Sequence, residues 1–219
     1  MRQYKRPLNI VLLGRSGSGK GTQLNLLKKK LPLIEIDTGG LLRRFIKQKN
    51  KVAQNIAKIM AKGNLVPSWL AVCVWLPAVI KAPDKKGLIF EGSPRTLYEA
   101  KVLHEVLKLA DRRRLRVIYL DVPEKEVKKR LLARRICARC GREYSLELTP
   151  GLKRCPVCGG RLVRRLDDTP KAINSRMKFF KEYIIPVIKY FKKEKILIKI
   201  DGVGSIEEIH QRIVKRLRI

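Results

Sequence analysis

The segment from Gly14 to Thr22 has the residue types and spacing of a loop that binds phosphate. It reads Gly-Arg-Ser-Gly-Ser-Gly-Lys-Gly-Thr, follows a short apolar run and precedes a helical pattern. Glycines let backbone N–H groups converge on phosphate oxygens, and the helix that begins there adds its dipole. We expect Lys20 to reach the β- and γ-phosphates of a nucleotide, with Thr22 near the metal ion. The candidate phosphate-binding residues are Gly14, Ser16, Gly17, Ser18, Gly19, Lys20, Gly21 and Thr22.

Four of the five cysteines form two Cys-x-x-Cys pairs, Cys137 with Cys140 and Cys155 with Cys158, and fourteen residues separate the pairs. Four thiolates at this spacing favour tetrahedral zinc, and the glycines after each pair permit tight turns. Because four sulfur ligands leave no open position, we expect a structural Zn²⁺ that folds a small insertion and takes no part in chemistry. We expect the fifth, Cys73, to be a small buried apolar residue.

The elements that must position these residues are visible as alternating patterns. Short apolar runs that end in turn residues predict five strands, at 8–13, 33–36, 87–90, 117–120 and 196–200. Helical patterns occur at 20–31, 97–109, 124–135, 171–192 and 206–217. Strands that alternate with helices form a parallel sheet, and ligands lie beyond the carboxyl ends of its strands. We therefore expect an α/β fold of the P-loop NTPase type, a parallel five-stranded sheet with helices on both faces.

Two segments interrupt this alternation. Residues 38–66 are helical and polar and show no strand pattern, whereas 130–168 are rich in Arg and Gly and hold both cysteine pairs. We interpret them as two insertions on the ligand side of one core, which comprises 1–37, 67–129 and 169–219. The apolar stretch after the first insertion contains Trp69 and Trp75, and we expect both to lie in the core.

The composition limits the classes of protein and of partner. The length of 219 residues suits one α/β domain with small insertions. The net charge of +32 attracts anions such as nucleotides or nucleic acid. We see no secretory signal, and the longest uncharged stretch contains Pro67 and Pro77, so we expect a cytoplasmic protein without a membrane partner. A zinc knuckle on a basic chain also leaves nucleic-acid binding open, through non-specific charge only.

Six ordered motifs resemble those of the adenylate kinase family along nearly the whole chain. They are Gly19-Lys20-Gly21-Thr22-Gln23, Thr38-Gly39 with Arg43, Gly63 to Pro67, Glu91-Gly92-Ser93-Pro94-Arg95-Thr96, Arg134-Arg135-x-Cys137, and Arg165-x-Asp167-Asp168 with Arg176. The resemblance implies reversible, Mg²⁺-dependent phosphoryl transfer from ATP to AMP, giving two ADP, by a monomer. It also implies that 38–66 bind the monophosphate and that 130–168 are a zinc-binding lid.

The resemblance assigns roles to individual positions. The residues implied to be catalytic are Lys20, Arg95, Arg134, Arg165 and Arg176. Beyond the phosphate loop, Arg130 and Arg134 are implied to bind ATP, with Thr22 and Glu91 at the Mg²⁺ site. The residues implied to bind the nucleoside monophosphate are Thr38, Gly39, Arg43, Leu65, Val66, Gly92, Arg95, Glu99, Arg165 and Arg176. Arginine suits these roles because its guanidinium binds phosphate in a bidentate manner.

Four positions depart from the family pattern. Gly40 stands where the family usually has Asp, Glu91 replaces Asp, and Ser93 replaces Phe; the first two weaken the carboxylates that order magnesium and its waters. Glu99 stands where the family usually has a Gln that pairs with adenine, and an ionised Glu can only accept hydrogen bonds. GMP, CMP or UMP therefore remain alternative acceptors, unless Glu99 faces solvent and a neighbour reads the base. Nucleotide or nucleic-acid binding without turnover is a further alternative.

Overall fold

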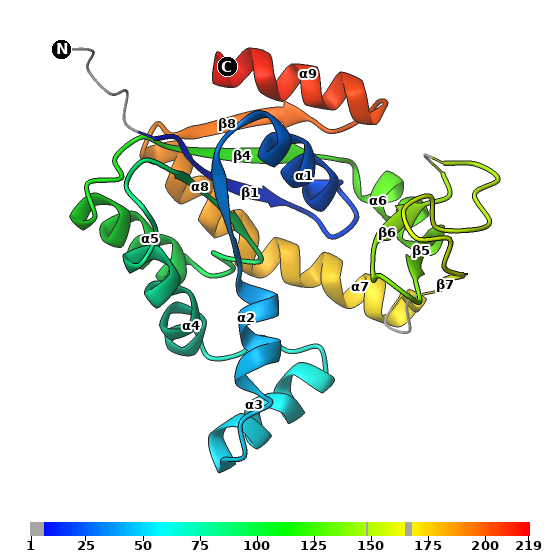
Figure 1. Cartoon of the computed structure of the whole chain (residues 1–219), viewed down its shortest axis with the longest axis horizontal. Helices are drawn as coiled ribbons and strands as arrows, with labels where there is room; N and C mark the ends of the chain where they lie inside the picture. The colour runs from blue at the N-terminus through cyan, green and yellow to red at the C-terminus, as the bar shows by residue number, and fades with distance from the viewer. Residues whose placement is uncertain (1–6, 148, 165–167) are drawn as a thin grey trace.

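A computed structural model describes residues 7–147, 149–164 and 168–219, and its centre is a five-stranded parallel sheet with the order β2-β3-β1-β4-β8 (Figure 1). The strands are β1 (Asn9–Gly14), β2 (Leu33–Asp37), β3 (Gly87–Glu91), β4 (Leu115–Asp121) and β8 (Leu197–Asp201). Each lies within two residues of its predicted range. The sequence-based prediction of an α/β fold with a parallel five-stranded sheet is confirmed.

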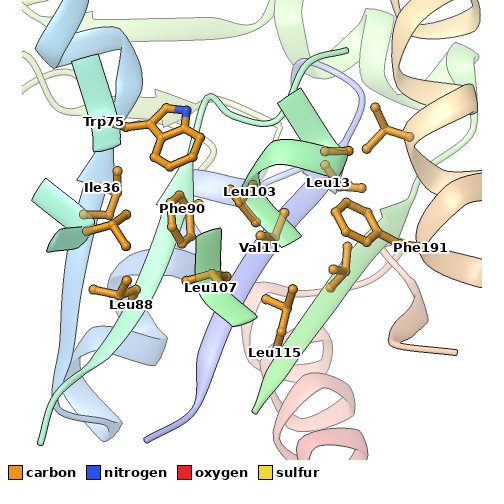
Figure 2. Packing of buried hydrophobic residues seen from close by; sticks show 14 of the residues in the cluster. Val11, Leu13, Ile36, Trp75, Leu88, Phe90, Leu103, Leu107, Leu115 and Phe191 are labelled. Atoms are coloured by element: carbon orange, nitrogen blue, oxygen red, sulfur yellow. The ribbon is translucent and has the colours of Figure 1, made fainter. Parts of the chain in front are cut away.

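Helices cover both faces of this sheet. On one face lie α1 (Lys20–Lys30) and α9 (Ile206–Leu217); on the other lie α4 (Ser68–Ile80), α5 (Leu97–Leu109) and α8 (Ile185–Lys193) (Figure 1). Alternate residues of β1 point to the two faces: Ile10 packs on the side of α1 and α9, and Val11 packs on the side of α4, α5 and α8. Figure 2 shows the larger cluster, in which Val11 lies between Phe90 and Phe191, and the ring of Trp75 packs edge-on against that of Phe90.

The first predicted insertion consists of α2 (Thr38–Phe45) and α3 (Lys51–Ala61), with no strand among its residues, all of which are described. The two helices project from the sheet (Figure 1). Their apolar sides form a separate small cluster, in which Leu42 and Ile56 meet Val66 and Leu70. The insertion is thereby packed against the start of α4, the helix that leads back into the core.

The second predicted insertion contains a small antiparallel sheet with the order β6-β5-β7. Its strands are β5 (Arg134–Cys137), β6 (Glu143–Ser145) and β7 (Leu162–Val163). The prediction of a helix through residue 135 is wrong, because α6 (Glu124–Leu132) ends where β5 begins to pair with its neighbours. Cys137 ends β5 and is paired with Leu162, and the other three cysteines lie outside the three strands, so a few strand residues and the sulfur atoms organise the insertion.

The helix that returns from the insertion is not continuous. It consists of α7 (Pro170–Phe179), a π-helical turn η1 (Phe180–Ile184) and α8, where a single helix was predicted over 171–192. Pro186 lies in the first turn of α8 and has no backbone N–H to donate to the preceding turn. A widened π turn accommodates such a missing hydrogen bond.

Helix α4 is apolar on nearly all sides, yet only one side packs on the sheet. Trp75 is fully buried as expected, but Trp69 is 54% exposed, and Cys73 is also exposed. The expectation that Trp69 and Cys73 are buried is therefore wrong, because both lie on the outer side of a helix that covers the sheet's edge. Among the residues described, no helix combines the length and the apolar character that crossing a bilayer requires.

Candidate functional site

The phosphate loop lies between the end of β1 and the start of α1, as predicted. Gly17 and Gly19 adopt positive φ angles of 82° and 91°, which residues with a side chain rarely adopt. No side chain caps the N-terminus of α1, so its first N–H groups face the loop without a side-chain acceptor. Ser18 Oγ is buried and has no hydrogen-bond partner among the described residues. A bound phosphate would satisfy these donors.

The ammonium group of Lys20 folds back over this loop. Its Nζ donates to the carbonyl oxygens of Gly14 and Arg15, at 2.9 and 2.8 Å. Burial lowers the pKa of Lys20 to about 8; the charge of Glu91 opposes this shift, and those of Arg95 and Arg134 add to it. Lys20 is thus close enough to two arginines from different parts of the chain for their charges to affect its pKa.

The ends of β2 and β3 meet beside the phosphate loop. Asp37 and Glu91 are paired in the parallel register, and a Cβ atom built on Gly21 would lie 3.6 Å from Glu91 Oε1. Burial raises the pKa of Glu91, and the charges of Asp37 and Glu35 raise it further. Carboxylate oxygens in this place, with the hydroxyl of Thr22 nearby in sequence, are the hard ligands that fit Mg²⁺ beside a nucleotide's phosphates.

The start of the first insertion lies at the same edge. Thr38 is buried, and its hydroxyl has no hydrogen-bond partner among the described residues. Gly39 follows it, and Arg43 reaches back to Asp37, with 3.3 Å between Nη2 and Oδ2. At the far end of the insertion Val66 is buried and Leu65 is partly buried. An unsatisfied buried hydroxyl is uncommon in native structures, and a ligand atom or a water molecule would satisfy it.

The turn from Gly92 to Thr96 positions Arg95, whose Nε donates to the Gly92 carbonyl at 2.8 Å. Glu99 stabilises this turn through two hydrogen bonds: its Oε2 accepts from Ser93 Oγ at 2.7 Å and from the Arg95 backbone N–H at 2.9 Å. The solvent-facing alternative for Glu99 is wrong, since the residue is only 3% exposed.

Sequence reasoning missed this role of Glu99, although a local signal was present. Thr96 is the N-cap of α5 and accepts from the Glu99 backbone N–H. A Thr followed three residues later by Glu is the spacing of a capping box, in which the Glu side chain turns back toward the start of its helix. Here the carboxylate reaches Ser93 and Arg95, one turn before the helix.

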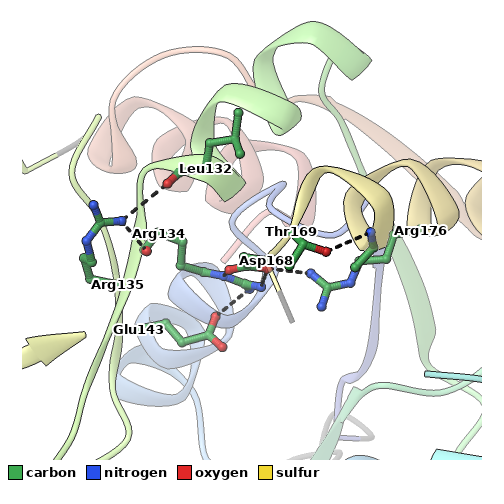
Figure 3. Close-up of polar contacts among 8 residues, drawn as sticks. Leu132, Arg134, Arg135, Glu143, Asp168, Thr169 and Arg176 are labelled. Carbon is green, nitrogen blue, oxygen red and sulfur yellow. Dashed lines mark hydrogen bonds and ion pairs between the residues drawn. The ribbon is translucent and has the colours of Figure 1, made fainter. Parts of the chain in front are cut away.

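Arg134 of the second insertion and Arg176 of α7 meet at one carboxylate, that of Asp168 (Figure 3). Arg134 Nε and Nη2 each lie 2.6 Å from an oxygen of Asp168, and Arg176 Nη1 lies 2.7 Å from its Oδ1. Burial alone would raise the pKa of Asp168, but the hydrogen bonds and charges of Arg134 and Arg176 outweigh it and lower the pKa. Asp168 therefore holds the two guanidinium groups together against their mutual repulsion.

Arg130 and Arg165 are the other two arginines that the resemblance places at the site. Arg130 is buried, donating from Nε to Glu126 at 2.8 Å and from both terminal nitrogens to the Gly202 carbonyl at 3.3 Å. The structure thus encloses Arg130 between α6 and the loop after β8, and the neighbouring Leu131 lies against the phosphate loop, 2.8 Å from a Cβ atom built on Gly17. Arg165 lies outside the described residues.

The four predicted cysteine ligands converge. Their sulfur atoms all lie within 4.8 Å of one another, with Cys137 Sγ 3.4 Å from Cys158 Sγ and Cys140 Sγ 3.6 Å from Cys155 Sγ. Zinc–sulfur bonds of about 2.3 Å in a tetrahedron require sulfur separations in this range. The cluster is consistent with a structural Zn²⁺. The Tyr144 hydroxyl lies 3.1 Å from Cys155 Sγ, a contact that sequence reasoning did not foresee.

Comparisons with known proteins agree with one another. A family model described as adenylate kinase matches residues 12–196. An adenylate kinase of Thermosipho melanesiensis is 37% identical over 213 residues, which cover 96% of this chain and 100% of that protein. One from Staphylococcus epidermidis is 34% identical, covering 94% and 97%, and one from Dehalococcoides mccartyi is 35% identical, covering 96% and 98%.

Proposed function

Because this chain belongs to the adenylate kinase family, we propose that it transfers the γ-phosphoryl group of MgATP reversibly to AMP, giving two ADP. The observation that carries the proposal is the Lys20 ammonium folded over the phosphate loop, where the charges of Arg95 and Arg134 act on it and lower its pKa. Phosphoryl transfer depends mainly on positioning and on neutralising the charge of equatorial oxygens. Lys20, with Arg95 and Arg134 near enough to act on its charge, supplies that neutralisation.

On the ATP side, the loop from Gly14 to Thr22 cradles the phosphates with its backbone N–H groups. Lys20 exchanges its carbonyl partners for the β- and γ-phosphates, and Ser18 gains a partner for its buried hydroxyl. Thr22 and Glu91 would hold Mg²⁺, which would offset phosphate charge when bound. Arg134 moves from Asp168 toward the transferring group as the lid closes, and Arg130, on α6, lies over the base of ATP.

On the acceptor side, arginines bind the phosphate and smaller groups border the nucleoside. We assign the phosphate to Arg43, Arg95, Arg165 and Arg176. The residues that border the nucleoside are Thr38, Gly39, Leu65, Val66, Gly92 and Glu99. The buried, unpaired hydroxyl of Thr38 supports this assignment, because it needs a ligand atom or a water molecule to satisfy it.

The proposal divides the chain into three working parts. Residues 1–37, 67–129 and 169–219 form the core, 38–66 bind the monophosphate, and 130–168 form the lid. A lid stiffened by zinc closes as a unit and excludes water from the transferring phosphoryl group, which would otherwise be lost to hydrolysis. The chain works as a monomer in the cytoplasm, where reduced thiols suit zinc, and binds nucleic acid only through non-specific charge.

A second candidate function, in the same class, rests on Glu99. Its Oε2 is committed to Ser93 and Arg95, whereas its Oε1 makes only a long contact of 3.4 Å with Thr96 Oγ1 among the interactions described. Oε1 can accept from the amino group of adenine or from the N–H groups of guanine. GMP is therefore the acceptor to test most carefully against AMP.

The test measures ADP formed from MgATP with AMP, GMP, CMP or UMP in the zinc-loaded protein. We expect turnover with AMP and a small fraction of it with the others, and loss of turnover in Lys20→Ala with an unchanged melting temperature. A preference for GMP that disappears in Glu99→Gln would make Glu99 the specificity residue. Folded protein that turns over none of the four would refute the kinase proposal and leave nucleotide or nucleic-acid binding without catalysis.

A further inference from the structure

The end of β2 places a carboxylate beside the proposed magnesium site that the sequence motifs did not single out. Asp37 is the last residue of β2, and it is paired in the parallel register with Glu91, the last residue of β3. Residues paired in this way project to the same side of a sheet about 5 Å apart. Asp37 and Glu91 also act electrostatically on one neighbouring cation, since the charges of both raise the pKa of Arg95 against the effect of its burial.

The side chain of Asp37 occupies the space that a side chain at position 40 would need. A Cβ atom built on Gly40 would overlap Asp37 Oδ2 and would lie 3.0 Å from its Cγ. In this conformation the chain can therefore present a carboxylate from position 37 or from position 40, but not from both. It has Asp at the first position and Gly at the second.

Capping of α2 uses only one oxygen of Asp37. Its Oδ1 accepts from the Gly40 backbone N–H at 2.9 Å and so caps the helix. Its Oδ2 meets Arg43 Nη2 at 3.3 Å, in a pair whose side chains are 65% exposed for Arg43 and 42% exposed for Asp37. An exposed pair at this distance is weak. Once Arg43 turns to an acceptor phosphate, Oδ2 is left facing the site.

We propose that Asp37 is the second carboxylate of the magnesium site, holding a magnesium-bound water beside Glu91 from the space that Gly40 leaves free. The inference rests on the proposed kinase function. Mg²⁺ at a nucleotide keeps several of its waters and is held by one or two carboxylates in addition to the phosphates. Glu91 at the phosphate loop is one such carboxylate, and Asp37 on the neighbouring strand supplies the other.

The test separates the charge of Asp37 from its capping role. Asn caps a helix as well as Asp does, so Asp37→Asn keeps the cap and removes the carboxylate. Calorimetry measures ATP affinity in EDTA and with Mg²⁺, and the EPR spectrum of Mn²⁺ in the ATP complex reports the metal's surroundings. We expect Asp37→Asn to reduce the gain in ATP affinity from Mg²⁺ by about tenfold and to alter the Mn²⁺ spectrum, without loss of affinity in EDTA.

Asp84→Asn is the matched control, because it changes the net charge equally at an exposed position. It should leave the magnesium-dependent gain unchanged. Asp37→Ser should lose the gain, and Asp37→Ser with Gly40→Asp should recover it, since Ser also caps α2 and vacates the space that an Asp at position 40 needs.

The proposal is overturned if Mg²⁺ increases the ATP affinity of Asp37→Asn as much as that of wild-type protein. It is also overturned if the folded double variant recovers none of this increase. Failure of the kinase proposal would give a different result. Wild-type protein would then form no ADP, whether or not Mg²⁺ strengthens its binding of ATP. Melting temperatures verify that each variant is folded.

Discussion

At the scale of single residues, the site is built from groups that are partly satisfied by the protein itself. Lys20 bonds two carbonyls of its own loop, and Arg134 and Arg176 share Asp168. Only the hydroxyls of Ser18 and Thr38, within the described part of this site, are buried without a partner. Substrate phosphates therefore replace existing contacts, and this preorganisation limits the rearrangement required on binding.

The lowered pKa of Lys20 predicts how activity depends on pH. In the free protein its pKa is about 8, mainly because of burial, so the ammonium loses its proton as the pH rises through that value. Only the charged form attracts phosphate. We expect kcat/KM for MgATP to be level below pH 8 and to fall about tenfold per pH unit above it.

The Lys20→Arg variant is the control for this profile, because arginine keeps its charge throughout the accessible range. We expect its lower kcat/KM to show no fall above pH 8. The same fall in both proteins would assign the titration to another group, such as the nucleotide or its metal. A profile of wild-type protein that stays level to pH 10 would contradict the lowered pKa of Lys20.

At the scale of elements, we expect the zinc cluster to stabilise the lid, which has little hydrophobic core of its own. The lid sheet has only three short strands among its described residues, and Cys137 and Cys155 are its buried cysteines, at 1% and 2% exposure. So little apolar surface cannot offset the entropy of ordering the segment. The sulfur–metal bonds supply the missing stabilisation.

Removal of zinc should therefore unfold the lid and spare the core. In calorimetry of metal-verified protein, we expect a strong chelator to remove the lid's contribution to unfolding and to leave the transition of the parallel sheet. We further expect Tyr144→Phe to retain zinc about tenfold less tightly, because its hydroxyl lies beside Cys155 Sγ.

Tyr98→Phe is the matched control, since Tyr98 is 55% exposed on α5 and far from the cysteines in sequence. It should retain zinc like wild-type protein. A chelated sample with an unchanged calorimetric trace would show that the lid folds without metal. Equal zinc retention in both phenylalanine variants would show that the Tyr144 hydroxyl does not support the cluster.

At the scale of the whole molecule, the charge of +32 acts on stability as well as on binding. Crowding many like charges into a folded chain destabilises it through self-repulsion, and salt screens such repulsion over about 10 Å near 0.1 M. The same field attracts anionic nucleotides. Salt should thus strengthen the fold while it weakens substrate binding.

We expect the melting temperature of the zinc-loaded protein to rise with NaCl, and KM for ATP to rise over the same range. Differential scanning fluorimetry and initial rates measure the two effects. Stabilisation by phosphate or sulfate alone would point to anion binding at the phosphate loop instead. A melting temperature that falls with NaCl would show that attractive ion pairs, such as those around Asp168, dominate the balance.

The sequence by itself determined the features that depend on neighbours along the chain. The five strands were predicted within two residues, and the four cysteines were predicted to converge, because alternation and Cys-x-x-Cys pairs are local patterns. The alternation of strands and helices predicted a parallel sheet, but it did not predict the order of the strands.

Only the tertiary structure decided which side of each element meets which partner. Helix α4 is apolar nearly all round, so its sequence could not tell that Trp75 faces the sheet and Trp69 faces away. Asp37 became a candidate ligand only when β2 paired with β3 and set it beside Glu91. Likewise, Asp168 gathers arginines from β5 and α7. These outcomes depend on groups distant in sequence, whose approach is set by packing and pairing and not by local pattern.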